Sequence, residues 1–196
     1  MTPTTKRIGR IEEAGMFRTL MGCSVALIVF LNFGHATALS GAIQATGATQ
    51  VNKADIDATV DAAPEGRVSD QQIRMVDAGG HNVGIGVVHR PATNSSSGIV
   101  HDKQTEVYQI LSGAGEMITG GTLTNPRPMN PMGATVRQLT GPSSFGTGIE
   151  GGESRRVVAG DMVIVPAGVP HGFGRIEEAI TYLVIRVDPE QVVELK

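Results

Sequence analysis

The sequence predicts a small all-β domain, built as a barrel or sandwich and preceded by an N-terminal signal segment and a short helix. Glycine is abundant, with 26 residues, which favours many tight turns. Aromatic residues make up only 4% and tryptophan is absent, so the core is expected to consist mainly of Val, Ile and Leu. From residue 68 onward, short β-prone runs alternate with Gly and Pro, as in small barrels and sandwiches. We expect the barrel domain over residues 67–190.

Residues 1–38 are expected to be a signal peptide. Four basic residues precede an uncharged apolar run at residues 20–33, and the Ala-Thr-Ala of residues 36–38 offers a cleavage site of the small-x-small type. The run is too short to cross a bilayer comfortably, which favours cleavage near Ala38 over a permanent anchor. An uncleaved anchor or a buried helix is the alternative. A mature domain released in this way would be periplasmic or secreted, with no stable membrane span.

Residues 39–66 are expected to form a linker followed by a short helix. The helix is predicted near residues 54–62, with Asn52 in a position to cap its N-terminus. The pattern changes at Val68, where short apolar runs are interrupted by Gly79 and Gly80, as in a hairpin. The barrel is therefore expected to begin there, and residues 191–196 are expected to be a C-terminal tail, either exposed or in contact with a neighbouring subunit.

The stretch Ile99–Gly113 contains the first candidate site residues. Side chains of one strand share a face only at even spacing, so His101 and Glu106, five residues apart, need a break in the ladder between them. Residues 102–105 supply such a break as a short turn. His101 and Glu106 can then point into one cavity, and Tyr108 shares the face of Glu106 on the following strand.

A second stretch, residues 160–171, predicts a strand, a turn that contains Pro166 and Gly168, and then His171. Two imidazoles and one carboxylate delivered by two strand-turn units indicate a metal site made of His101, Glu106 and His171. A polar cavity without a metal is the alternative. Burying these groups without a partner is costly, so a cation is the simpler interpretation.

These two stretches resemble the cupin motifs. The spacing of His101, Glu106 and Gly113 is similar to the second half of the first cupin motif, and residues 160–171 are similar to the core of the second motif. The resemblance covers residues 68–190 and implies a cupin-type jelly-roll fold. It also implies a fourth ligand at the position of Ile99, where metal-binding cupins usually have a histidine. His89 is a candidate replacement, although it also suits an exposed strand end.

The donor set favours one divalent cation of iron, manganese, zinc, nickel or cobalt, with iron slightly preferred, because no thiolate is present. Two histidines and one carboxylate resemble the facial triad of non-haem iron oxygenases. A redox-inert metal would instead polarise a carbonyl or hydroxyl group for an isomerase or lyase. Tyr108 is the candidate catalytic acid or base, and its alternative is a packed tyrosine with a satisfied hydroxyl.

Three further segments have informative patterns. Gly113–Gly115 predicts a turn after which residues 116–119 return as a partner strand. Residues 122–152 are rich in Pro and Gly and predict an irregular lid or binding loop, or else an inert insertion. Residues 180–187 predict a strongly β-prone strand on which Tyr182, Val184 and Arg186 share one face.

The charge and composition limit the partners. A formal net charge of −3 and the lack of a dense basic cluster argue against nucleic-acid binding. The favoured function is a metal-dependent, oxygenase-like enzyme acting on a small organic molecule, and the resemblance adds homodimer formation. The alternatives are an isomerase or lyase acting on a sugar or a hydroxy or keto acid, a binding module outside the cytoplasm, and a structural homo-oligomer with a vestigial pocket.

Overall fold

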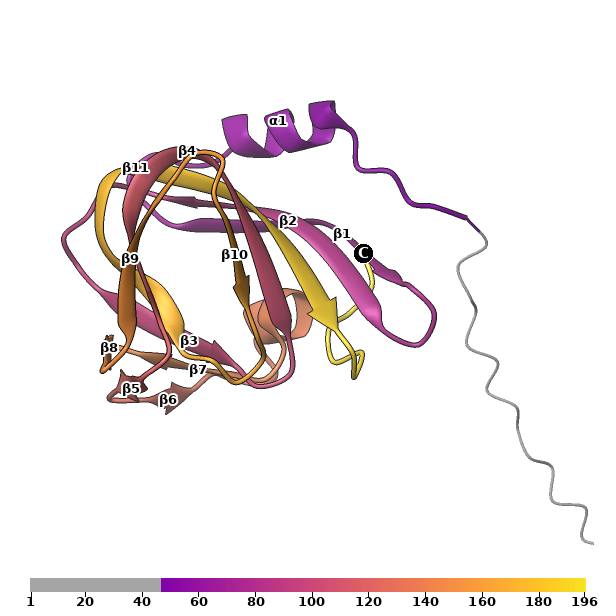
Figure 1. Cartoon of the computed structure of the whole chain (residues 1–196). Coiled ribbons are helices and arrows are strands. Elements are labelled where there is room, and N and C mark those ends of the chain that lie inside the picture. The colour runs from indigo at the N-terminus through magenta and orange to yellow at the C-terminus, as the bar shows by residue number, and fades with distance from the viewer. Residues whose placement is uncertain (1–46) are drawn as a thin grey trace, which may run out of the picture. The chain divides into compact units, whose positions relative to one another are not determined.

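A computed structural model describes residues 47–196 of the chain, so the expected signal peptide at residues 1–38 lies outside the described residues (Figure 1). Helix α1 (Lys53–Asp61) follows the cap residue Asn52 and confirms the predicted short helix. The backbone N–H of Asn52 donates to the carboxylate of Asp55 at 3.4 Å, which supports the first turn. Within residues 47–196, no helix has the length and apolar character needed to span a membrane.

The rest of the described chain is mainly β-structure. Eleven strands and one short helical segment follow α1. They are β1 (Ser69–Asp77), β2 (Asn82–Arg90), β3 (Ser97–His101), β4 (Thr105–Thr119), β5 (Thr122–Thr124), β6 (Arg127–Pro128), η1 (Val136–Thr140), β7 (Ser143–Gly146), β8 (Gly148–Glu150), β9 (Glu153–Val158), β10 (Met162–Val165) and β11 (His171–Asp188).

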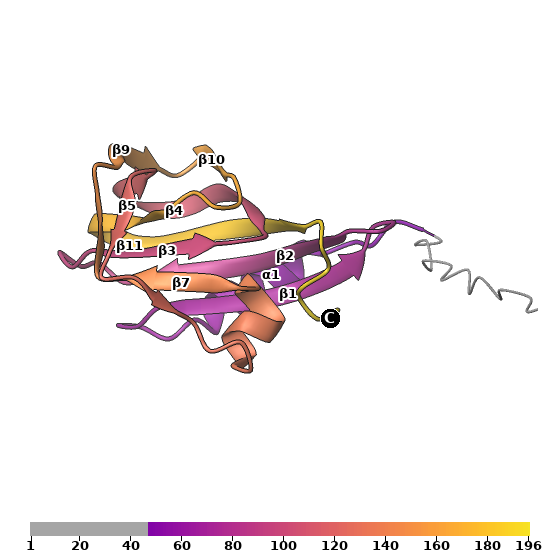
Figure 2. The ribbon, with the colours of Figure 1, turned by 90° about the horizontal axis from the view of Figure 1, so that it is seen from below.

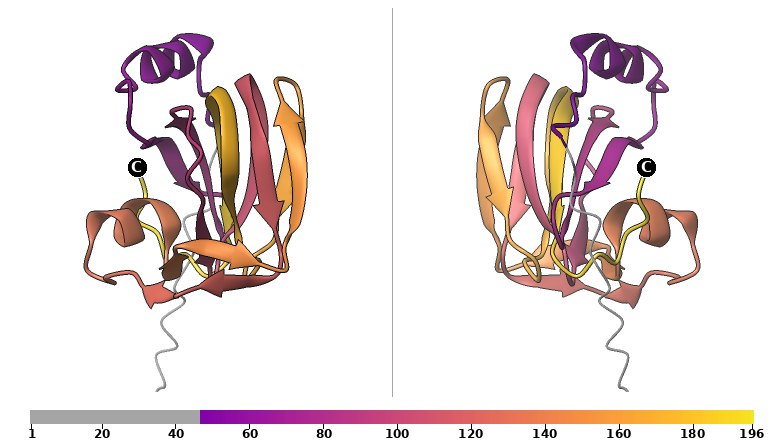
Figure 3. Two further views of the ribbon diagram at one scale, coloured as in Figure 1. Left: turned by 90° about the vertical axis from the view of Figure 1, so that its left-hand side faces the viewer. Right: turned by 90° about the vertical axis from the view of Figure 1, so that its right-hand side faces the viewer.

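The strands pair in an antiparallel manner and wrap around one core. A nine-stranded sheet runs in the order β1-β2-β11-β3-β7-β6, and β4 joins it beside β11 and carries β9 and β10 on its other side. Strands β5 and β8 form a separate small pair. Figures 2 and 3 show β9 and β10 beyond β4 on one side of the molecule and β1 on the other. This arrangement confirms the predicted all-β jelly-roll class.

Strand β11 holds the two halves of the barrel together. Its first residues pair with β3 and with the end of β4, and its second half pairs with β2 and with the start of β4. The buried core is apolar and includes residues from β2, β4, β9, β10 and β11. Tyr108, Phe173 and Tyr182 supply the aromatic part of this core, and each is at most 4% exposed. Burial of such side chains provides the main driving force for closing the barrel.

The predicted turn at Gly113–Gly115 is wrong. Strand β4 continues through it from Thr105 to Thr119, pairing with β10 before this point and with β9 after it. Gly113 has φ 81° and faces the backbone of β11, where a Cβ would meet the carbonyl oxygen of Ala179 at 2.1 Å. Glycine is needed there because the two strands approach closely and shift register, so it bends the strand without reversing it.

The prediction of an irregular loop at residues 122–152 is also wrong. This segment contains β5, β6, η1, β7 and β8, and β7 pairs with β3 in the main sheet. Each of its strands is only two to four residues long, which is too short to give a recognisable alternating pattern between the prolines and glycines. The segment is therefore part of the scaffold that supports the site.

The C-terminal segment is partly exposed and partly packed against its own chain, since Gln191, Glu194, Leu195 and Lys196 are exposed and Val193 is buried. Val193 is 3% exposed, and the side-chain amide of Asn82 donates to its carbonyl oxygen at 2.9 Å. The backbone of Lys196 exchanges two hydrogen bonds with Met75 of β1, each 3.0 Å long. Near η1, the backbone N–H of Glu194 donates to the carbonyl of Arg137 at 2.9 Å. These contacts hold the tail beside β1 and η1.

Replacing Gly113 with Ala is expected to lower the free energy of unfolding by about 3 kcal/mol, since it adds a steric clash to an unfavourable φ. The matched control is Gly120→Ala. Gly120 has a similar φ of 78°, but no atom lies within 4 Å of the position that a Cβ would take, so only about 1 kcal/mol should be lost. Urea unfolding of the full chain measures both values, and equal losses would contradict the close-approach explanation.

Candidate metal centre

The structure brings together the three predicted metal-ligating residues. His101 ends β3, Glu106 lies near the start of β4 across a short turn, and His171 begins β11. Their side chains are buried, with 4%, 1% and 3% exposure respectively. One nitrogen or oxygen atom of each residue lies within 4.8 Å of the others. The Nε2 atoms of both histidines are 3.4 Å from Oε2 of Glu106.

These distances suit a shared cation. With metal–ligand bonds of about 2.1 Å, two ligand atoms lie about 3.0 Å apart at a right angle and about 3.4 Å apart at a tetrahedral angle. The observed separation of 3.4 Å between each imidazole nitrogen and the carboxylate oxygen falls in this range. Among the described residues, this is the group of His, Cys, Asp and Glu side chains that could hold an ion.

The hydrogen bonds of the histidines leave both Nε2 atoms available as ligands. Nδ1 of His171 faces the carbonyl oxygen of Val169 at 3.0 Å, so Nδ1 must carry the proton. Nδ1 of His101 faces the hydroxyl of Ser143 at 2.8 Å, and that hydroxyl donates to nearby backbone carbonyls, so it accepts from His101. With the proton on Nδ1, the lone pair that a metal ion requires is on Nε2 of the neutral ring, and each Nε2 points toward Glu106.

An unsatisfied buried nitrogen supports the fit to a cation. Nε2 of His171 is buried and has no hydrogen-bond partner in the structure. Two neutral imidazoles with lone pairs on Nε2 would repel the carboxylate, so this buried cluster needs a positive charge between its members, either a proton or a metal ion. A divalent ion would satisfy all three groups at once. The residues present therefore fit the metal that the sequence predicts.

The electrostatic surroundings keep Glu106 ionised. Burial raises the pKa of this carboxyl, but hydrogen bonds from His101 and His171 when their Nε2 atoms carry a proton, and the positive charge of Arg186, outweigh burial, so the pKa lies well below its usual range. A carboxylate that is charged at neutral pH is the form that ligates metals. The pocket thus presents one anionic and two neutral donors.

Tyr108 is placed directly against the candidate ligands. Its hydroxyl donates a hydrogen bond of 2.5 Å to Oε2 of Glu106, and the side chain is 4% exposed. Burial and the neighbouring charge of Glu106 raise the pKa of Tyr108 well above its ordinary value, so the phenol keeps its proton at neutral pH. It orients the carboxylate as a hydrogen-bond donor. Its role as a catalytic acid or base stays a prediction.

Sequence reasoning missed the role of Arg186 as the partner of Glu106. Arg186 lies opposite Glu106 in the pairing of β11 with β4 and is 2% exposed. Its Nε donates to Oε1 of Glu106 at 3.0 Å, while its two terminal nitrogens donate to Gln72 at 2.8 Å and Asp70 at 2.6 Å. The signal was the alternation of residues 180–187, which puts Arg186 on the same inward face as Tyr182 and Val184.

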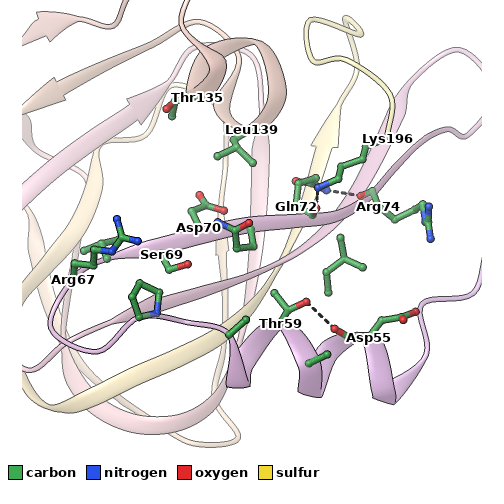
Figure 4. A pocket seen from close by; sticks show the side chains of 16 residues that line it. Asp55, Thr59, Arg67, Ser69, Asp70, Gln72, Arg74, Thr135, Leu139 and Lys196 are labelled. Carbon is green, nitrogen blue, oxygen red and sulfur yellow. Dashed lines mark hydrogen bonds between the residues drawn. The ribbon is translucent and has the colours of Figure 1, made fainter.

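The partners of Arg186 connect the metal centre to a larger cavity. Asp70 and Gln72 lie on β1 and line an open cavity of about 860 Å³ between β1, α1 and η1 (Figure 4). Lys196 also lines this cavity, and its ammonium group donates to the backbone carbonyl of Gln72 at 2.6 Å. A chain of polar contacts thus runs from Glu106 through Arg186 to this surface.

His89, the candidate replacement ligand, lies outside the metal centre. His89 contacts the hydroxyl of Thr181 through Nδ1 at 2.9 Å and is not part of the candidate metal group. It therefore does not replace the ligand missing at Ile99. Arg155 and Arg156 form exposed ion pairs with Glu153 and Glu177. Neither arginine belongs to the buried cluster around Glu106.

Comparisons with known proteins add structural relatives at low sequence identity. No family model and no curated protein matches the chain. DMSP lyase DddQ from Ruegeria pomeroyi DSS-3 is 21% identical over 61% of this chain, with a TM-score of 0.39. KdgF from Halomonas sp. is 13% identical over 64% of this chain and 84% of its own, with a TM-score of 0.41. This chain spans 46% of the length of the DMSP lyase.

A third similar structure is a conserved protein with a double-stranded β-helix domain from Klebsiella pneumoniae. It is 16% identical over 74% of this chain and 94% of its own, with a TM-score of 0.46. The class of this protein follows from its own topology, in which both motif stretches meet inside an antiparallel barrel. The chain has the cupin-type fold that its sequence predicts, with a candidate metal centre in the barrel.

Replacing Arg186 with Met is expected to lower the free energy of unfolding by about 3 to 5 kcal/mol, because it leaves the Glu106 carboxylate without its buried counter-charge. Thermal and urea unfolding measure this loss. The matched control is Arg156→Met, which breaks an exposed ion pair with Glu177 and should cost less than about 1 kcal/mol. Similar small losses for both variants would show that the buried ion pair contributes little.

Proposed function

We propose that this protein binds one divalent metal ion through His101, Glu106 and His171 and uses it to transform a small organic molecule. The observation that carries the proposal is the buried Nε2 of His171, which has no hydrogen-bond partner among residues 47–196 yet points, like Nε2 of His101, at an ionised carboxylate. Iron is the preferred ion, which makes an oxygenase-like reaction the leading candidate. An isomerase or lyase reaction with a redox-inert ion is the second candidate.

A bound ion would supply Lewis acidity and, if it is iron, the capacity to bind and reduce oxygen. The protein residues do the positioning. Ser143 and the carbonyl of Val169 fix the two imidazoles in the tautomer that leaves Nε2 free, and Arg186 and Tyr108 hold the two oxygens of Glu106. The apolar barrel core excludes bulk water from this cluster.

Two further features belong to the proposal. A periplasmic or secreted location is proposed from the pattern of residues 1–38, and a homodimer from the cupin resemblance. Activity in the mature form can be tested on protein recovered from a host periplasm. A non-catalytic binding module shares the same pocket but would show no turnover.

Elemental analysis of the purified full chain is expected to find about one divalent ion per molecule, and Glu106→Gln is expected to lose most of it because the amide is neutral. The matched control Glu178→Gln alters an exposed glutamate of β11 and should keep the wild-type metal content. Circular dichroism of each variant reports whether the fold is retained. Unchanged metal content in folded Glu106→Gln would overturn the ligand assignment.

The same preparation separates the two reaction classes. Protein reloaded with Fe²⁺ is expected to consume oxygen in the presence of candidate small organic acids and sugars, whereas Zn²⁺-loaded protein is not. Turnover that proceeds without oxygen and with Zn²⁺ would favour the isomerase or lyase reaction. Metal binding without turnover under any of these conditions would favour the binding module.

Replacing Ser143 with Ala is expected to weaken metal affinity about 10- to 100-fold, because Nδ1 of His101 loses the group that fixes its tautomer. Competition with a chromophoric chelator measures this affinity. Ser144→Ala is the matched control, since residue 144 is the next residue on β7 and points to the opposite face of the strand. Equal affinities in both variants would remove Ser143 from the supporting contacts.

A further inference from the structure

A second arginine close to the core differs from Arg186 in having free hydrogen-bond donors. Arg90 is the last residue of β2, and its Nε donates to the hydroxyl of Tyr182 at 3.1 Å. Its guanidinium carbon lies 5.4 Å from the ring centre of Phe173. Within residues 47–196, no carboxylate forms an ion pair with Arg90, whereas Arg186 has three acceptors. Its two terminal nitrogens therefore remain available to a ligand.

Arg90 borders a cavity whose lining suits an anion. The cavity has a volume of about 260 Å³. Its lining combines polar side chains with apolar ones such as Phe173 and Ile176, and among the described residues it contains no acidic side chain. The polar members are Arg67, Arg90, Thr93, Ser95, Ser96 and Ser97. Guanidinium and hydroxyl donors around one space are the groups that bind carboxylate and phosphate oxygens.

The cavity lies beside the candidate metal centre. His171 and Phe173 are two residues apart on β11, and they pair with Ile99 and Ser97 on β3. Residues two apart on a strand share a face and are separated by about 7 Å. Ile99 and Phe173 thus lie between His171 and the cavity residue Ser97, and Phe173 also lines the cavity. The ring of Tyr182 packs in the same interior, with its centroid 5.9 Å from that of Phe173 and 4.5 Å from that of Tyr108.

From these observations we propose that the substrate is a small organic acid whose carboxylate binds Arg90. Its apolar segment lies along Ile99 and Phe173, and a second oxygen-bearing group points to the metal at His171. Ser97 supplies an additional hydroxyl donor on the same face of β3 as Ile99. This inference rests on the proposed metal function for its second contact, but the contact with Arg90 does not require the ion.

Titration calorimetry with glutarate, a flexible dicarboxylate, tests the proposal on the full chain with Zn²⁺ and after chelation. Glutarate is expected to bind the wild type in both forms and more tightly with Zn²⁺. Arg90→Met is expected to weaken binding about tenfold or more in both forms, since it removes a charge-assisted contact. Glutaramide, the uncharged analogue, is expected not to bind measurably.

Controls separate this inference from the metal proposal. Arg155→Met removes an exposed positive charge elsewhere and should leave glutarate affinity unchanged. Arg90→Lys, which retains the charge, should bind with intermediate affinity, and it replaces Arg90→Met as the test if circular dichroism shows that Arg90→Met is unfolded. Metal content, measured on each sample, reports on the metal proposal alone. Equal glutarate affinity of the wild type and the folded Arg90 variant, or no saturable binding by the wild type, would overturn the proposal.

Discussion

The buried ion pair between Glu106 and Arg186 is the interaction on which the rest of the site depends. It joins opposite residues of β4 and β11, so the register of these two central strands brings the charges together. Because Arg186 holds Oε1, Oε2 remains free to face the two histidines and the Tyr108 hydroxyl. A buried carboxylate without such a partner would tend to take up a proton and lose its value as a ligand.

The histidines depend on one contact that is distant in the chain and one that is local. Ser143, which fixes the His101 ring, comes from β7, and the carbonyl of Val169 comes from the turn before β11. The two arginines near the core differ in their contacts. Arg186 is saturated by protein acceptors and stabilises the site, while Arg90 keeps donors free at a cavity. This difference in saturation distinguishes a structural guanidinium from one available for recognition.

The candidate ligands were predictable because their spacing is local. His101 and Glu106 lie on either side of one turn, and His171 follows a Pro/Gly turn, so simple strand geometry pointed all three inward. Ser143 was not predictable, because its strand is hidden among prolines and glycines and its contact with His101 spans the fold. The continuity of β4 through Gly113 was missed for a related reason. A glycine that ends a strand and one that bends it look alike in sequence and differ only in what lies opposite.

The packing of the last residues beside β1 has a consequence for solubility. Among the strands, β1 pairs only with β2, so its other side would offer unpaired backbone groups to another chain. Lys196 occupies part of that side through its two backbone hydrogen bonds with Met75. Residues at the C-terminal end therefore block part of the β1 edge from pairing with a strand of another molecule. Such edge-to-edge pairing leads to aggregation in sheet proteins at high concentration.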